Sequence, residues 1–158
     1  MADQIHAPTH RVGAFAIIRD DTGRVLISRR TDSGWYNLPG GGVEPHESAT
    51  EGVIREVREE TGLAIEVGRL VGVYSKPQKH EIVLTFEARV VGGTMQPSDE
   101  ADQHDWITAD EVDRWQILPK HRERIEDALR NEAAAIIKDQ RQPSTRSDAR
   151  EAEQQGGM

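Results

Sequence analysis

Cysteine is absent from all 158 residues of this sequence. Disulfide bonds, thiolate metal sites and cysteine nucleophiles are therefore excluded. The chain also lacks an excess of positive charge, since its formal net charge is −8. A general nucleic-acid binder usually presents a basic face, so we expect no long nucleic-acid partner. A nucleotide substrate is still compatible with this charge, because a bound metal can mask local acidity.

Long apolar segments are missing as well. Residues 1–10 are polar and contain no apolar core of a signal peptide, and no run elsewhere is long enough to cross a membrane. These absences favour a cytoplasmic protein without a membrane partner. The chain is 35% hydrophobic over its 158 residues, which is enough for one domain with a hydrophobic core.

Strand-like segments dominate the first two thirds of the chain. Apolar and β-branched residues predict strands, and Gly, Asp and Pro clusters predict the turns and loops between them. The predicted strands are 11–20, 24–29, 64–74 and 81–91, with turns at 20–23 and 92–93, a loop over 31–47 and a short extended segment at 105–108.

Two helices carry recognisable boundaries. Ser48 is a candidate N-cap of a helix to about Thr61, with Glu51 placed as in a capping box and Gly62 placed to end it. A brief helical segment is predicted at 109–115. A long helix is predicted over 121–138, because apolar residues recur near helical period at 125, 128, 129, 133, 136 and 137.

The domain organisation follows from this pattern. We expect a flexible N-terminus over 1–10, one folded domain over 11–138 and a disordered tail over 139–158, where apolar periodicity stops. Strands mixed with two well-defined helices predict an α/β sandwich.

The helix over 48–61 has an unusual distribution of charge. Ala49, Val53 and Val57 form an apolar stripe at spacing four, with Ile54 beside it, so this is the predicted core face. Acidic residues fall on or against the same stripe instead of on the opposite face.

These acidic residues are Glu56 and Glu60, with Glu59 to one side. Burying ionised carboxylates is unfavourable unless something compensates their charge, and a divalent cation would do so. Oxygen ligands without His or Cys suit Mg²⁺ or Mn²⁺, which complete their coordination with water and substrate phosphates. The pattern therefore indicates phosphate chemistry. The competing interpretation is that the three acids only solvate the helix surface.

Residues 41–63, GGVEPHESATEGVIREVREETGL, resemble the Nudix box of MutT-like hydrolases. The match includes every fixed position of that 23-residue pattern, which here are Gly41, Glu47, Arg55, Glu56, Val57, Glu59, Glu60, Gly62 and Leu63. Similarity continues through WYNLPGG at 35–41 and VLISRR at 25–30, and covers roughly 12–129. The resemblance implies a Nudix fold, an α/β/α sandwich around a mixed β-sheet.

The resemblance also implies roles for residues of the box. Metal ligands would be Glu56, Glu59, Glu60 and the Gly41 carbonyl, with Glu59 and Glu60 also catalytic. An ion pair between Glu47 and Arg55 would be structural, and Glu44 is a candidate close to the metals and the substrate. His46 stands where the family often has glycine, and no role is assigned to it.

Candidates outside the box are less specific. Glu100 is similar in position to a family residue that binds metal or activates water, with Asp99 and Asp102 as competitors and plain loop acidity as the alternative. Arg30 matches a position near the nucleotide, although strand alternation turns only one of Arg29 and Arg30 inward.

Two further candidates for substrate binding each have a structural alternative. Trp35 could stack on a base, or pack beneath the loop. Lys79 lies with Tyr74, Lys76 and His80 around a turn that could border the cleft, or that is simply a solvated basic turn.

The resemblance implies a Mg²⁺-dependent hydrolase of the diphosphate linkage in a nucleotide-type small molecule. Nucleoside triphosphates, ADP-ribose and dinucleoside polyphosphates all fit, and family members are often homodimers. The alternative is a non-catalytic Nudix-fold nucleotide sensor, although such modules commonly lose acids of the box and this chain has them all. An isopentenyl diphosphate isomerase shares the fold but relies on a cysteine, which is absent.

Overall fold

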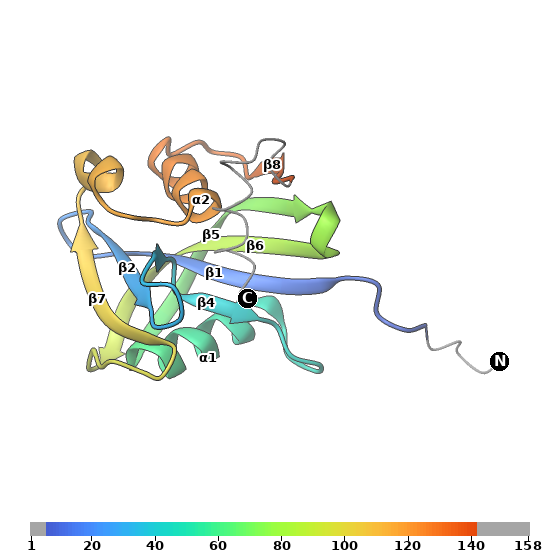
Figure 1. Cartoon of the computed structure of the whole chain (residues 1–158), viewed down its shortest axis with the longest axis horizontal. Helices are drawn as coiled ribbons and strands as arrows, with labels where there is room; N and C mark the ends of the chain where they lie inside the picture. Colours follow the sequence, from blue (N-terminus) through green and yellow to red (C-terminus); the bar gives the residue numbers. More distant parts are fainter. Residues whose placement is uncertain (1–5, 142–158) are drawn as a thin grey trace.

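The structure is a computed structural model that describes residues 6–141, built around one mixed β-sheet (Figure 1). The strands are β1 (Arg11–Arg19), β2 (Val25–Arg30), β3 (Tyr36–Asn37), β4 (Gly40–Gly42), β5 (Leu63–Lys76), β6 (Glu81–Gly93), β7 (Ala101–Ile107) and β8 (Ile136–Asp139). The helices are α1 (Ala49–Thr61) and α2 (Pro119–Leu129), with 3₁₀ helices η1 (Pro77–Lys79) and η2 (Ala109–Arg114).

Strand β1 is the centre of the sheet. The order of the main path is β3-β2-β1-β6-β5-β8, with β4 added to β1 and β7 to β2. β1 runs parallel to β6 and antiparallel to β2 and β4, whereas β5 and β6 form a long antiparallel hairpin. The sheet is therefore mixed, as expected.

Alternation along β1 separates two hydrophobic layers. Phe15 and Ile17 point to one face, where they pack with α2 and η2, whereas Ala14, Ala16 and Ile18 point to the other face and pack with α1. Figure 1 shows the two helices on opposite sides of the sheet. Because successive side chains of a strand alternate, one buried strand can support both layers. The predicted α/β sandwich is confirmed. Within residues 6–141, no helix has the length and apolar character needed to span a bilayer.

The predicted helix over 121–138 is wrong in its second half. Helix α2 ends at Leu129, and Asn131 then adopts a left-handed backbone with φ of 51°, which a continuing helix does not allow. Strand β8 follows and pairs in parallel with Gly72–Ser75 of β5. The apolar spacing had suggested a buried helix face, but Ile137 is 80% exposed.

The residues that the structure describes continue past the expected domain boundary at 138. Asp139 is the last residue of β8, and the side chain of Gln140 is buried and hydrogen-bonded through both of its amide atoms. The remainder of the expected tail, 142–158, lies outside the described residues, as do residues 1–5 of the expected N-terminal segment.

Smaller differences arise where tertiary pairing overrides local sequence. The predicted loop 31–47 contains the short strands β3 and β4, and the extended segment expected at 105–108 begins earlier, at Ala101. Gly92–Gly93, expected as a turn, closes strand β6. Ile54, expected beside the core stripe, is 40% exposed, whereas Val53 is fully buried.

Candidate active site

Helix α1 is fixed at both ends by local interactions. The Ser48 hydroxyl accepts the Glu51 N–H, and the Glu51 carboxylate accepts the Ser48 N–H, which makes the predicted capping box. Gly62 ends the helix with φ of 78°, a left-handed conformation that favours glycine. Val53 and Val57 anchor the helix on the sheet, so the orientation of its acidic side chains is set by the core.

Two acidic residues one turn apart on α1 face the glycine strand β4. A Cβ on Gly41 would lie 2.6 Å from the carboxyl carbon of Glu56, so only glycine leaves room for this carboxylate. The N–H of Gly40 donates to Oε2 of Glu60 over 3.3 Å. The backbone of β4 and the side chains of α1 are therefore fitted to one another.

A third carboxylate, that of Glu100, lies in the segment directly before β7. Glu56, Glu60 and Glu100 each offer one oxygen, and these atoms all lie within 4.8 Å of one another. The position of Glu100 is held through its carbonyl, which accepts the N–H of Thr31 over 3.1 Å. Sequence analysis left Glu100, Asp99 and Asp102 as competitors, and the structure brings Glu100 to the helix acids.

Burial makes this cluster electrostatically unfavourable without a cation. Glu60 is only 8% exposed, and burial raises the pKa of its carboxyl well above the ordinary value, with Glu56 and Glu100 raising it further. Burial raises the pKa of Glu56 too. Three close carboxylate oxygens are hard ligands, so the residues fit Mg²⁺ or Mn²⁺ by their chemistry.

Arg55 connects the helix to the loop before it. Its guanidinium donates to both oxygens of Glu47, at 3.0 Å from Nε and 2.7 Å from Nη2, and also to the Gly42 carbonyl at 3.0 Å. The hydrogen bonds from Arg55 lower the pKa of Glu47 to about 2. This bidentate pair matches the geometry of the predicted structural ion pair.

Glu59 occupies a different place from the other helix acids. Its side chain is 58% exposed and accepts Arg55 Nη1 at 3.2 Å, so it does not belong to the group of three oxygens. It lines a hollow of about 200 Å³ together with Glu60 and Glu100. Its predicted ligand and catalytic roles stay predictions.

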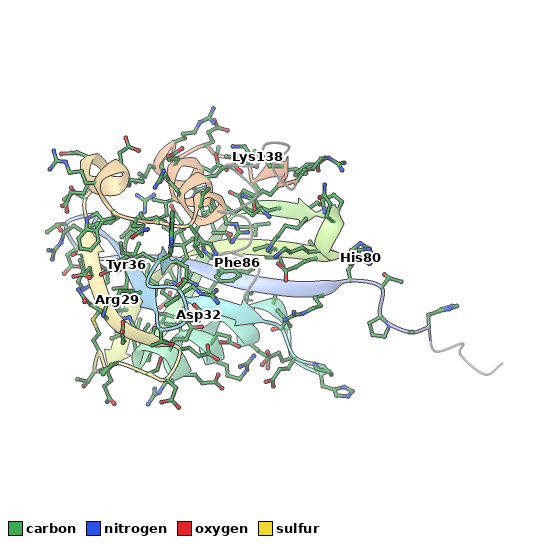
Figure 2. All side chains as sticks on the ribbon, viewed as in Figure 1. Arg29, Asp32, Tyr36, His80, Phe86 and Lys138 are labelled. Atoms are coloured by element: carbon green, nitrogen blue, oxygen red, sulfur yellow. The ribbon has the colours of Figure 1, made fainter. Side chains whose placement is uncertain are left out.

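The carboxylates open into a cleft of about 390 Å³. Its lining residues are Arg11, Arg30, Thr31, Asp32, Asn37, Gly40, Gly41, Gly42, Glu56, Glu60, Asp99, Glu100 and Ala101. Arg30, predicted near the nucleotide, lines this cleft and pairs with Asp32. Arg29 points elsewhere and pairs with Asp102 at 2.8 Å (Figure 2 labels Arg29 and Asp32).

Three of the four predicted substrate-binding residues do not line the cleft. Trp35 is half-buried outside it, Glu44 is exposed and 3.7 Å from Arg55, and Lys79 lies in a separate hollow. Conversely, sequence analysis did not select Arg11 or Asn37. Asn37 lies within the WYNLPGG stretch, so that resemblance was an available signal, whereas the position of Arg11 depends on pairing between distant strands.

A family model described as the NUDIX domain matches residues 9–128 of the chain. The chain belongs to the Nudix family. The matched residues include the whole cleft, from Arg11 to Ala101, and the resemblance of residues 41–63 to the Nudix box is confirmed.

Individual Nudix relatives agree with this assignment. A MutT-like protein of Streptomyces ambofaciens is 40% identical over 105 residues, which cover 66% of this chain and 68% of that protein. An ADP-ribose pyrophosphatase of Methanocaldococcus jannaschii is 34% identical over 125 residues, with 75% and 73% covered. The crystal structure of a NUDIX hydrolase from Nitrosomonas europaea superposes with a TM-score of 0.75 at 21% identity, covering 87% of this chain and 82% of that one. The expected Nudix fold is confirmed.

Proposed function

We propose that this Nudix protein hydrolyses the diphosphate linkage of a nucleoside triphosphate or a nucleoside diphosphate derivative, using Mg²⁺ or Mn²⁺. The observation that carries the proposal is the convergence of Glu56, Glu60 and Glu100 within 4.8 Å, at the wall of a cleft that also presents Arg11 and Arg30. Carboxylates that hold a cation beside arginines suit a substrate rich in phosphate.

Glu56, Glu60 and Glu100 would hold the cation, with the Gly41 carbonyl and Glu59 as further candidates. When bound, the cation supplies stabilisation of the negative charge that develops on the phosphoryl oxygens. Arg30 also lines the cleft, where its guanidinium group can donate to phosphate oxygens.

The nucleophile in this proposal is water, and the lack of cysteine in the chain is consistent with this. Glu100 is exposed and its carboxylate lines the cleft, where it can accept the proton that the attacking water loses. Glu59 and Glu60 are the other candidates for this step. No covalent intermediate is required.

Three groups of substrates fit this proposal: deoxynucleoside triphosphates, ADP-ribose and dinucleoside polyphosphates. The name of the Methanocaldococcus jannaschii relative supports ADP-ribose. The acidic balance of the chain, with a formal net charge of −8, argues against a long RNA substrate.

A phosphate-release screen tests the proposal. Purified protein is incubated with Mg²⁺ and a panel of the three substrate groups, with and without EDTA, and products are coupled to a phosphatase or pyrophosphatase. We expect hydrolysis that depends on Mg²⁺ and is lost in EDTA. If the folded protein binds a nucleotide but hydrolyses nothing on the panel, the chain is a nucleotide sensor instead.

A further inference from the structure

A second hollow adjoins the catalytic cleft. It has a volume of about 390 Å³ and lies between the segment that leads into β1 and the turn between β5 and β6. Its lining residues are Pro8, Thr9, His10, Arg11, Gln78, Lys79 and His80. Figure 2 shows His80 beside the start of β1, and the Arg11 N–H donates to the His80 carbonyl over 2.8 Å.

Arg11 belongs to both hollows and connects them. Its side chain lines the cleft that holds the carboxylates, and Nη2 lies 3.6 Å from the position of a Cβ on Gly42. The guanidinium is therefore next to the glycine strand of the candidate metal site. A substrate that extends from Glu56 past Gly42 reaches the second hollow by passing Arg11.

The second hollow is basic in a protein that is acidic overall. Arg11, Lys79, His10 and His80 line it, and no carboxylate within residues 6–141 does. Among the described residues, the side chains of Arg11 and Lys79 have neither a hydrogen bond nor an ion pair. Most positively charged side chains on a protein surface pair with an acidic neighbour or point into solvent. The side chains of Arg11 and Lys79 instead line the same concave surface.

Further cations lie behind the turn. Lys76 is buried and pairs with Glu81 at 2.8 Å. Lys120 is buried as well, and burial together with the charges of Lys76 and Lys79 lowers its pKa to about 8. The charge of Lys76 is balanced by Glu81, whereas Lys120 adds positive charge near the turn and favours an anion in the adjoining hollow.

We propose that Arg11 and Lys79 form a subsite for a phosphate group of the substrate that lies beyond the diphosphate at the three carboxylates. This inference rests on the proposed function and narrows its substrate class. Substrates whose phosphate chain continues past the scissile linkage, such as dinucleoside polyphosphates, use the subsite. ADP-ribose does not, because its far end is an uncharged ribose.

Comparing two substrates in matched charge variants tests the subsite. The value of kcat/KM is measured for diadenosine tetraphosphate and for ADP-ribose in the wild type, Arg11→Gln, Lys79→Gln and the control Arg114→Gln, an exposed cation on η2. Loss of one charge-assisted contact should lower the tetraphosphate-to-ADP-ribose ratio about tenfold in the first two variants. The ratio in Arg114→Gln should equal that of the wild type. An unchanged ratio in all three variants overturns the proposal.

Direct binding provides a readout that needs no turnover. Inorganic tripolyphosphate is titrated calorimetrically into metal-free protein at low salt, where exposed charges are least screened. We expect the wild type and Arg114→Gln to bind it and the double variant Arg11→Gln with Lys79→Gln to lose binding. Equal affinity in all proteins rules out the subsite. If no substrate is hydrolysed by the wild type, the proposed function fails, and the tripolyphosphate titration still decides whether the subsite exists.

Discussion

His121 accepts the backbone N–H of Leu38 at Nδ1 over 3.1 Å, which ties helix α2 to the segment that leads into β4. The imidazole is 2% exposed and packs edge-on against Phe15 at a centroid distance of 5.0 Å. Burial, together with the nearby charge of Arg124, lowers its pKa well below the ordinary value, so the ring is neutral and Nδ1 is free to accept. Two residues further along, Gly40 donates to Glu60.

Replacing this histidine tests the connection. His121→Ala leaves the Leu38 N–H buried without an acceptor, which should lower the free energy of unfolding by about 1–3 kcal/mol in addition to the lost packing. Urea unfolding of the metal-free protein measures it. The control is His10→Ala, which removes an exposed imidazole and should change stability very little. Equal midpoints for the two variants would contradict the role given to this hydrogen bond.

Gly41 is predicted to be required for the position of one carboxylate. In Gly41→Ala, the new methyl group would lie 2.6–2.8 Å from the Glu56 carboxylate, the end of a flexible side chain, so Glu56 moves and the backbone is retained. Displacing a metal ligand by about 1 Å can reduce turnover about 100-fold. Turnover and unfolding are measured in parallel with Gly92→Ala, where the nearest atom is 3.7 Å away. Comparable turnover in the two variants would show that the Glu56 position is unimportant.

Glu60→Gln should separate activity from stability. The amide can still accept the Gly40 N–H, but it removes a negative charge that burial and two neighbouring carboxylates disfavour. We expect turnover to fall by orders of magnitude, while the free energy of unfolding in EDTA rises. Glu126→Gln, a change at an exposed position of α2, is the control. Near-normal turnover in Glu60→Gln would remove this residue from the proposed metal site.

The buried side chain of Lys120 should make the free energy of unfolding depend on pH in the alkaline range. Burial lowers its pKa to about 8, so between pH 8 and about 10.5 the unfolded chain binds more protons at this position than the folded protein. The free energy of unfolding should therefore rise with pH through this window. Lys120→Met should remove that contribution and be more stable than the wild type at pH 7. Urea unfolding at pH 7, 8 and 9.5 measures both effects, and parallel pH profiles for the two proteins would refute the assignment.

Gln140 is predicted to stabilise the fold from a position just after β8. Its side chain accepts Arg124 Nη2 over 2.8 Å, while Nε and Nη1 of that buried guanidinium have no hydrogen-bond partner among residues 6–141. Gln140→Ala removes the acceptor and should lower the free energy of unfolding by about 1–3 kcal/mol. Gln116→Ala, at an exposed position, is the matched comparison. Equal stability of the two variants would show that the Gln140 side chain adds nothing to the stability of the fold.

The features that sequence analysis predicted well are local ones. The capping box at Ser48, the end of α1 at Gly62 and the spacing of Glu56 and Glu60 all follow from residues within a few positions of one another. Residues four apart lie on the same face of a helix, so the sequence alone predicts that both carboxylates point to the same side.

The features that it missed depend on distant pairing. Nothing near Arg11 shows that β1 lies between β4 and β6, which is what brings its guanidinium to the cleft. The end of α2 was missed because apolar residues after Asn131 continue a helical spacing, whereas β5 provides a partner edge for β8. Glu59, placed to one side of Glu56 by helix geometry, accepts a hydrogen bond from Arg55, and the ligand role that the resemblance implies for it stays a prediction.

Strand β4 determines which wall of the cleft can move. Gly40, Gly41 and Gly42 are paired with Phe15, Ala14 and Gly13 of the central strand, so this wall of the cleft is part of the sheet itself. Opening it requires the same rupture that unfolds the core, and its amide protons should exchange with solvent as slowly as those of β1. The wall around Thr31 and Glu100 lies just beyond the last β2–β7 pair, Arg30 with Ala101, and is joined by loop hydrogen bonds. Any widening of the cleft to admit a substrate or release a product therefore occurs at the wall around Thr31 and Glu100. The amide protons of that wall should exchange with solvent faster than those of β4.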